Sequence, residues 1–432
     1  MHRSEDGRGS DAILGAGALG LTLALRLAQQ GRSVDVYERE PLPGGLAAGF
    51  EVAPGIWLDR FYHHIFRSDR HAVRLIEELG LGSALTWHRP VTATLRDGTM
   101  HQLDSPMSLL RLDPLPLVDR LRMGAWLAFL RALPGPGILE GQRAARWIRR
   151  TMGRRAYDVV WGPLLEGKFG AAAEEIALPW FWARVHDRTP DLGYVDGGFQ
   201  RLYDALAERI RSLGGRIHFG TAVESVEQDR GGFSVQASGG SQRFARVIST
   251  LPTRLTCRLV RALPEAYRQR HDWGRAYGAH CLILALDRQL TDDVYWLNVN
   301  DPGFPFMALV EHTNMRSPDE YGGRHLVYLG NYRPMDDPLL ASPVEAVLEG
   351  FVPALARINP EFDRSWITDA WSFAAPFAQP IVTTDYRHHI PPLETPVPGL
   401  FVANMFQVYP HDRGQNYSIQ LAERAASALA RG

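Results

Sequence analysis

A glycine pattern near the N-terminus constrains the fold of this chain more than any other feature. Three glycines at G-x-G-x-x-G spacing lie between a short apolar run and a stretch with apolar residues at helical spacing. The pattern comprises a strand at 12–14, the glycines Gly15, Gly17 and Gly20, a helix over 19–30, a strand over 33–37 and Glu38 directly after it. This order predicts a βαβ unit that opens a doubly wound, mostly parallel sheet.

The same residues predict a dinucleotide site. Glycines let the backbone approach a pyrophosphate, which lies at the positive N-terminal end of the helix. Glu38 accepts hydrogen bonds from ribose hydroxyls and repels a 2′-phosphate, so a site for NADP is disfavoured. The alternative is a plain structural turn, which the flanking strands, helix and acid together make the weaker interpretation.

The composition is that of a globular protein with two packed domains. The chain has 432 residues, of which 45% are hydrophobic and 22% are charged. Its 47 basic and 48 acidic residues give a net charge of -1, so no nucleic-acid partner is expected. Cys257 and Cys281 lie outside any C-x-x-C pattern, which excludes a disulfide framework and a thiolate zinc site and suits a reducing, cytoplasmic location.

The apolar patterns divide the chain into two lobes. Strand and helix signals of an α/β type come from three segments, 11–75, 191–263 and 386–432, and predict one discontinuous, doubly wound (Rossmann-like) lobe. The block 76–190 has a helical pattern, and the block 264–385 has longer strands with alternating aromatic residues. These two blocks predict a second, mixed α+β lobe that binds the substrate.

Several segments together resemble one large family. Gly44 and Gly45 follow the ribose acid closely, and further matching segments lie at 195–199, 221–226, 247–252 and 399–404. The chain thereby resembles the superfamily of FAD-dependent amine oxidases, protoporphyrinogen oxidases and phytoene desaturases. The resemblance implies that FAD is the cofactor, that Gly44 and Gly45 run against its nucleotide, and that the backbone near Val223 meets the adenine. Since neither cysteine lies in a segment assigned to the isoalloxazine, we expect the FAD to be bound without a covalent bond.

The segment 409–417 leads into the last helix and, by the same resemblance, lies at the flavin. Asp412, Gly414 and Asn416 are therefore expected to contact the cofactor. A helix N-terminus there stabilises the negative charge that reduced flavin carries at its pyrimidine ring. Asp412 or Asn416 acting as an ordinary helix cap is compatible with this role. Tyr417 is expected to contact the substrate.

The segment 58–66 resembles the loop that passes the isoalloxazine in these flavoproteins. Tyr62, His63 and His64 are therefore candidate catalytic residues. The two histidines are neighbours, and neighbouring side chains of an extended chain point to opposite faces. They are a poor chelating pair, and no metal site is expected.

Lys168 is the one lysine in a chain whose other 46 basic residues, histidine aside, are arginines. A lysine differs from an arginine where a compact amine that can lose its proton is needed. Lys168 also lies among glycines and aromatic residues, so we expect a catalytic role near the flavin. A surface cation is the alternative.

Other polar clusters are candidates for substrate binding. Glu311 and Asn314 follow a strand at 306–310, where ligands tend to bind in sheet proteins. An arginine-rich stretch over 143–155 is typical of a solvated helix face, or else it holds an anionic substrate group. The segment 109–133 mixes apolar residues and arginines, and we expect it to pack within the lobe rather than to contact a membrane surface.

The predicted function is that of an FAD-dependent oxidoreductase that removes a hydride from a carbon of a small molecule and transfers it to flavin N5. Oxygen or another acceptor then reoxidises the flavin. Two alternatives remain open: a mutase that acts on a nucleotide sugar with reduced flavin and no net redox change, and a flavoprotein without catalytic activity.

Overall fold

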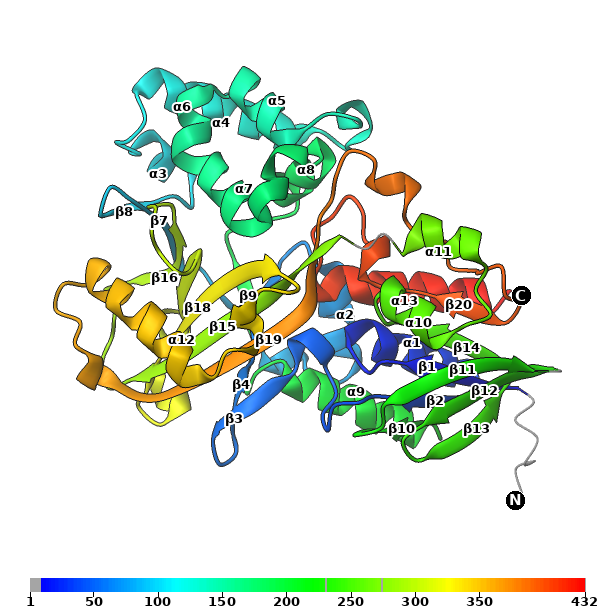
Figure 1. Ribbon diagram of the computed structural model, residues 1–432. Coiled ribbons are helices and arrows are strands. Elements are labelled where there is room, and N and C mark those ends of the chain that lie inside the picture. The colour runs from blue at the N-terminus through cyan, green and yellow to red at the C-terminus, as the bar shows by residue number, and fades with distance from the viewer. Residues whose placement is uncertain (1–8, 230, 273–274, 432) are drawn as a thin grey trace.

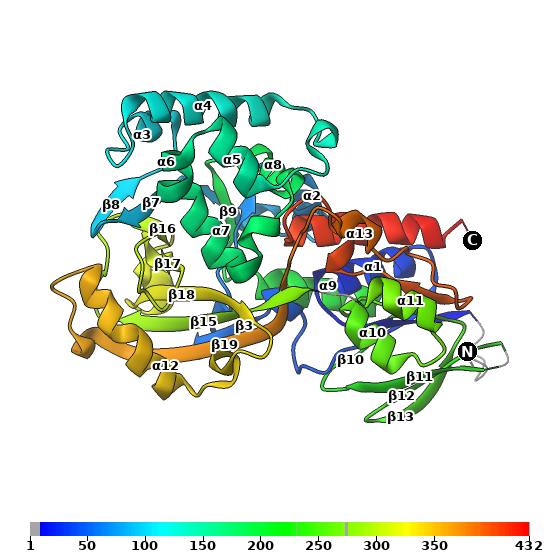
Figure 2. The same cartoon turned by 45° about the horizontal axis from the view of Figure 1, so that its top comes forward.

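The computed structural model describes residues 9–229, 231–272 and 275–431. The chain forms three regions that meet near the middle of the molecule (Figure 1). A parallel sheet with its helices lies at one side, a long curved antiparallel sheet lies at the other, and a group of helices covers the space above the second sheet. Figure 2 shows the same three regions with the helical group turned forward.

The first region is built on a parallel sheet of five strands in the order β10-β2-β1-β14-β20. Three segments that are far apart in the sequence therefore lie side by side. The strands are β1 (Ser10–Leu14), β2 (Ser33–Tyr37), β10 (Arg216–His218), β14 (Arg246–Ser249) and β20 (Leu400–Val402). This is the doubly wound sheet that the glycine pattern predicts.

Both faces of this sheet are buried, because alternate side chains of each strand enter different cores. Ile13 packs into the core beneath the helices α1 (Ala18–Gln29), α9 (Gln200–Ser212) and α13 (Gln415–Leu429). Ala12 and Leu14 enter the opposite core. That core is completed by β11 (Val223–Asp229), β12 (Gly232–Ala237), β13 (Gly240–Phe244), α10 (Thr253–Leu259) and α11 (Glu265–His271).

The second region is a sheet of seven strands in the order β19-β15-β18-β17-β16-β7-β8. All its pairs are antiparallel except β16 with β7. The helix α12 (Val344–Phe351) packs against it. Its strands are β7 (Val91–Arg96), β8 (Thr99–Gln102), β15 (Ala276–Leu286), β16 (Val294–Val299), β17 (Ala308–Glu311), β18 (His325–Pro334) and β19 (Ile367–Pro380).

The third region is helical and has its own apolar core. Its helices are α3 (Pro106–Leu110), α4 (Leu117–Ala132), α5 (Ala144–Thr151), α6 (Arg154–Ala156), α7 (Gly162–Phe169) and α8 (Leu178–His186). In α4, Met123 and Leu130 are buried, whereas Leu117, Val118 and Leu121 are exposed. The helix thus packs within the lobe along one face and presents apolar side chains outward along the other.

Small elements connect the regions. The hairpin of β3 (Gly49–Ala53) and β4 (Ile56–Asp59) leads into the segment that crosses the middle of the molecule. A three-stranded sheet joins β5 (Ile65–Phe66), β6 (Leu85–His88) and β9 (Leu192–Val195). The helix α2 (Arg70–Glu78) packs beside α13. Among the described residues, no helix has both the length and the apolar composition needed to cross a membrane.

Two predictions for the block 76–190, which was expected to be helical, are wrong. Residues 85–102 form the strands β6, β7 and β8, because their alternating side chains pair with β9 and β16 across the fold. The expected helical segment 109–133 is interrupted between α3 and α4, since Pro114 and Pro116 lack the N–H that a continuous helix needs.

Candidate active site

The glycine turn lies between β1 and the N-terminus of α1 and is held tightly against β2. Gly15 has φ of +103°, and its N–H donates to the Tyr37 carbonyl at 2.8 Å. A Cβ placed on Gly20 would lie 2.0 Å from the Gly15 carbonyl oxygen, so no larger residue fits there. By contrast, the nearest heavy atom to a Cβ on Gly17 would be 3.9 Å away. Gly17 therefore borders open space in front of the helix.

The second glycine pair packs against the first turn. Gly44 and Gly45 have φ of +116° and +57°, and the Gly44 N–H donates to the Ala16 carbonyl at 2.8 Å. A Cβ on Gly45 would lie 3.1 Å from the Gly17 Cα. The two loops thus form one cradle of bare backbone at the N-terminus of α1. This cradle fits a pyrophosphate, which needs close approach and backbone N–H donors.

Glu38 lies at the end of β2 beside this cradle. Its Oε2 accepts from the Ala16 N–H at 2.8 Å, and its Oε1 accepts from the Glu40 N–H at 3.0 Å. The Thr221 N–H donates to the Glu38 carbonyl at 2.7 Å, which brings the segment before Val223 next to the acid. Val223 begins β11 and packs against the second core of the sheet. The acid and this segment therefore border the same end of the cradle, as an adenosine half requires.

A cavity begins next to the cradle and extends between the three regions. Leu46, directly after the glycine pair, lines it, and so does the segment from Asp412 to Tyr417 at the N-terminus of α13. Its other walls come from the segment 61–66, from α7 and α8, and from strands of the seven-stranded sheet. Because Leu46 directly follows Gly45, the cavity begins beside the nucleotide cradle.

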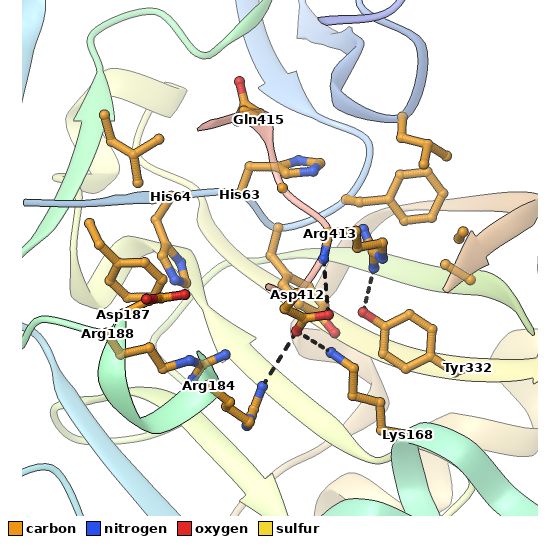
Figure 3. Close-up of a pocket in the computed structure, with 18 of the residues that line it drawn as sticks. His63, His64, Lys168, Arg184, Asp187, Arg188, Tyr332, Asp412, Arg413 and Gln415 are labelled. Carbon is orange, nitrogen blue, oxygen red and sulfur yellow. Dashed lines mark hydrogen bonds and ion pairs between the residues drawn. The ribbon is translucent and has the colours of Figure 1, made fainter. Parts of the chain in front are cut away.

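An ion pair between Lys168 and Asp412 lies in this cavity (Figure 3). Lys168 Nζ donates to Asp412 Oδ2 at 2.7 Å, and the Trp180 indole N–H approaches the other carboxylate oxygen at 3.3 Å. The Lys168 side chain is 7% exposed, so it is not a surface cation. Rings of Trp180 and Tyr332 lie 5.3 and 5.4 Å from the ammonium. The single lysine is therefore held at the point where the helical region meets the start of α13.

The pKa values of both members of this pair are lowered, that of Lys168 mainly by burial and that of Asp412 by the neighbouring cations. Burial lowers the pKa of Lys168 to about 7, with Arg184 and Arg413 adding to the shift and Asp412 opposing it. Burial alone would raise the pKa of Asp412, but Lys168, Arg184 and Arg413 hold it below its usual range. The carboxylate therefore stays ionised, and the lysine can gain or lose its proton near neutral pH.

Tyr62, His63 and His64, the candidate catalytic residues of the segment 58–66, all line the cavity. Burial lowers the pKa of His63 to about 4 and that of His64 to about 3, so both are neutral at pH 7. The Nδ1 atom of each is buried and has no hydrogen-bond partner within the described residues. Burial also raises the pKa of Tyr62, whose ring packs edge-on against Trp296 at 4.9 Å. The three residues form an uncharged wall.

The segment before α13 is fixed by its own side chains. Asn416 Oδ1 accepts from the backbone N–H of His71 and of Ala72, at 2.9 and 3.2 Å, so its side chain caps α2. Tyr417 donates to Asp187 at 2.8 Å. The backbone of Gly414 and Asn416 remains at the cavity wall, where the helix N-terminus offers N–H groups.

Glu311 and Asn314 do not line the cavity, in contrast to the expectation from the sequence. Glu311 is fully buried and accepts from the backbone N–H groups of Leu290 and Thr291 at 2.8 and 2.7 Å. Asn314 Nδ2 donates to the Val294 carbonyl at 3.0 Å. Both side chains hold the turn before β16, which explains their polarity at a strand end.

The arginine-rich stretch also lies away from the cavity. It forms α5 and α6, and Arg149 pairs with Glu174 and lies over the Tyr157 ring at 3.7 Å. The cations of the cavity are instead Arg184, Arg188 and Arg413, together with Lys168. Arg184 and Arg188 lie four residues apart in a segment rich in aromatic residues. This spacing is visible in the sequence and is the signal that could have identified them as candidates. No group of three or more His, Cys, Asp or Glu side chains suited to a metal occurs in the described parts of the chain.

Known proteins resemble the chain over nearly its whole length. The sequence profile of the flavin containing amine oxidoreductases matches residues 20–428. A 15-cis-phytoene desaturase from Synechococcus elongatus is 33% identical over 228 residues, which cover 48% of this chain and 48% of that protein. The chain thus matches less than half the length of the curated relatives.

Solved structures share the fold. A putative protoporphyrinogen oxidase from Exiguobacterium sp. 255-15 superposes with a TM-score of 0.78 at 15% identity, covering 98% of both chains. The structure of reduced UDP-galactopyranose mutase gives a TM-score of 0.76 at 16% identity, covering 98% of this chain and 96% of that one. At these identities the likeness concerns the fold, which serves both kinds of protein.

Proposed function

The chain belongs to the family of flavin-containing amine oxidoreductases, and we propose that it is an FAD-dependent oxidoreductase that removes a hydride from a carbon of a small-molecule substrate. The observation that carries this proposal is that the cavity, lined by Leu46 and by the start of α13, lies directly beside the glycine cradle. When bound, the flavin supplies the hydride acceptor, its N5 atom. Everything else in the reaction is binding, orientation and proton handling by the protein.

Residues of the cradle hold the nucleotide half of the cofactor. Gly17, Gly44 and Gly45 leave the backbone bare at the N-terminus of α1, and Glu38 offers a carboxylate to the ribose. The backbone of the segment 414–416 presents N–H groups toward the cavity and favours negative charge there. The protein thereby stabilises the reduced state of the flavin.

Lys168 donates or accepts a proton beside the reacting carbon. Its pKa of about 7 lets it donate a hydrogen bond as an ammonium in neutral solution and release a proton at slightly higher pH. Asp412 orients the amine by a 2.7 Å hydrogen bond. Tyr62, His63 and His64 line the same cavity, exclude water from it and add no charge.

The test is the visible spectrum of the purified protein under anaerobic conditions. Addition of a substrate should bleach the oxidised flavin, and admission of oxygen or another acceptor should restore it. Candidate amines, polyenes and carboxylated or phosphorylated alcohols are each added to the oxidised protein. Conversion of a substrate without bleaching, and only after prior reduction of the flavin by dithionite, would contradict this function.

A mutase that acts on a nucleotide sugar is the second candidate. The observation that favours it is the pair Arg184 and Arg188 in the cavity, since guanidinium groups bind phosphates well. The outcome just described, conversion with pre-reduced flavin only, would support it.

A further inference from the structure

Two arginines at the end of α8 project into the cavity. Arg184 lies in the last turns of α8, and Arg188 follows two residues after the helix ends. Figure 3 shows both guanidinium groups on the side of the cavity formed by Asp187 and His64. The two cations lie four residues apart in the cavity lining, where Arg184 is mostly buried and Arg188 is exposed.

The hydrogen-bonding capacity of both arginines is unused. Within the described residues, the one ion pair of Arg184 is with Asp412, at 3.8 Å, which is too long for a hydrogen bond. Arg188 has no hydrogen bond or ion pair in the same part of the chain, and its guanidinium lies 5.6 Å from the Phe66 ring. Both residues line the cavity; the Arg184 side chain is 11% exposed and Arg188 is an exposed residue, so their donors are accessible to a ligand from the cavity side. Each guanidinium carries five N–H donors.

The carboxylates of the cavity do not satisfy these donors, because each has other partners. Asp187 accepts from Tyr417 at 2.8 Å and pairs with His411 at 2.7 Å. Asp412 pairs with Lys168 at 2.7 Å. Asp69, the third carboxylate of the lining, accepts from the Phe66 N–H at 2.8 Å, and burial raises its pKa to about 6. The arginine side of the cavity therefore carries excess positive charge.

This charge selects among substrates. A protonated amine would be repelled by both guanidiniums, and a hydrocarbon would cover two cations without pairing them, which is unfavourable. A carboxylate or phosphoryl group would accept several N–H donors at once, in the paired geometry that arginine favours.

We propose that Arg184 and Arg188 form an anion subsite that holds a carboxylate or phosphoryl group of the substrate next to the Lys168–Asp412 pair. The proposal rests on the function proposed above and adds the chemical class of the substrate. Asp412 contacts both the subsite and Lys168, at 3.8 Å from Arg184 and 2.7 Å from the lysine. The anionic group is thereby placed next to the lysine that handles the proton.

The experiment measures binding of simple anions to the oxidised holoprotein by calorimetry, at constant ionic strength. Succinate, inorganic phosphate and pyrophosphate are the probes, and chloride is the reference. The first probe reports a carboxylate subsite and the other two report a phosphoryl subsite. We expect at least one probe to bind wild type in the millimolar range or better, and Arg188→Ala to weaken it about ten- to a hundred-fold, as loss of charge-assisted hydrogen bonds predicts.

Arg188→Ala is the main variant because its side chain holds no other residue of the described chain, so folding is unaffected. Arg188→Lys should recover part of the affinity, since a lysine keeps the charge but loses the paired donors. Arg154→Ala is the matched control, because Arg154 is 89% exposed in α6 and lies away from the cavity. It should bind the probe as wild type does.

Two results would overturn the subsite: failure of all three probes to bind wild type, or equal affinity of wild type and Arg188→Ala. Neither measurement requires the protein to turn over a substrate. If the protein retains FAD and is bleached by a substrate but binds no anion, the anion subsite is refuted and the proposed function stands. If the purified protein contains no FAD, the proposed function itself is refuted.

Discussion

The two ends of the site are built in opposite ways. At the proposed nucleotide end, glycines leave the backbone bare, and Glu38 is the one charged side chain assigned to the cofactor. At the cavity end, the wall is made of charged and aromatic side chains from segments between residues 46 and 417. The first end is defined by steric fit, and the second by electrostatics. A substitution at the first end should therefore abolish binding outright, whereas one at the second should change rates and pH dependence.

The largest expected effect is at the glycine turn. Gly17→Val should fold, because open space surrounds the added side chain, but it should lose FAD completely since the side chain occupies the pyrophosphate position. Gly20→Val should instead fail to fold, because its Cβ would overlap the Gly15 carbonyl oxygen. Visible absorbance, mass spectrometry for FAD and circular dichroism distinguish the two variants. A yellow Gly17→Val protein would refute the assignment of the cradle.

The second expected effect concerns how the flavin is attached. Cys257 and Cys281 are buried and do not line the cavity, so no thiol can reach the flavin. His63, His64 and His280 do line it, and the first two lie in the segment expected to pass the isoalloxazine. We expect acid precipitation to release all the colour into solution. A yellow pellet would show a covalent link, and its loss in His63→Ala or His64→Ala would identify the attachment point.

The same contrast explains what the sequence could predict. The glycine turn was predictable because its constraints are local: strand, turn, helix and acid lie within thirty residues. Lys168 was identifiable as the single lysine, but its partner Asp412 lies 244 residues away, and no local pattern encodes that distance. Asp412 was expected to contact the cofactor as part of a helix N-terminus, and its pairing with the lysine required the fold.

Polarity at a strand end was the weakest signal. Glu311 and Asn314 follow β17 in the way that ligand-binding residues do, yet they hold a turn of the chain. The cations that do face the cavity, Arg184 and Arg188, were hidden among the many arginines of the chain. In a chain with one lysine, arginines carry almost all positive charge, so the residue type does not separate functional from solvated cations.

The third expected effect is at the Lys168–Asp412 pair. Lys168→Met should slow flavin reduction about ten- to a hundred-fold, because one charge-assisted hydrogen bond in a closed site is lost. Lys168→Arg should not restore the rate, since the planar guanidinium keeps its charge and cannot take the place of a compact amine. The reductive half-reaction of the three proteins, with FAD occupancy measured in each, provides the comparison. Reduction of Lys168→Arg at the wild-type rate would rule out the proposed role.

The pH dependence of the flavin reduction rate distinguishes the proposed role of Lys168 from a purely structural one. Because the pKa of Lys168 is about 7, the ammonium is present below that pH and is lost above it. If the ammonium stabilises the developing negative charge of the flavin, the wild-type reduction rate should fall as the pH rises from 6 to 8. The inflection should be absent in Lys168→Met and Lys168→Arg. A wild-type profile that is flat over this range would contradict the assignment.

The smallest expected effect is on stability and tests the uncharged wall of the cavity. Burial, with Arg188 and His63 adding to it, lowers the pKa of His64 to about 3, while an unfolded chain keeps a histidine pKa of about 6.5. Below about pH 6.5 the unfolded state therefore binds a proton that the folded state does not, so stability is lost as the pH falls toward 3. At pH 5 this one residue accounts for at most about 2 kcal/mol.

His64→Phe retains the packing against Phe66 and Trp296 and removes the titration. The thermal midpoint of wild type should drop by about 2 °C more than that of His64→Phe between pH 7.5 and pH 5. Equal drops in the two proteins would mean that His64 takes up its proton in the folded state, and the wall would then carry charge under the flavin.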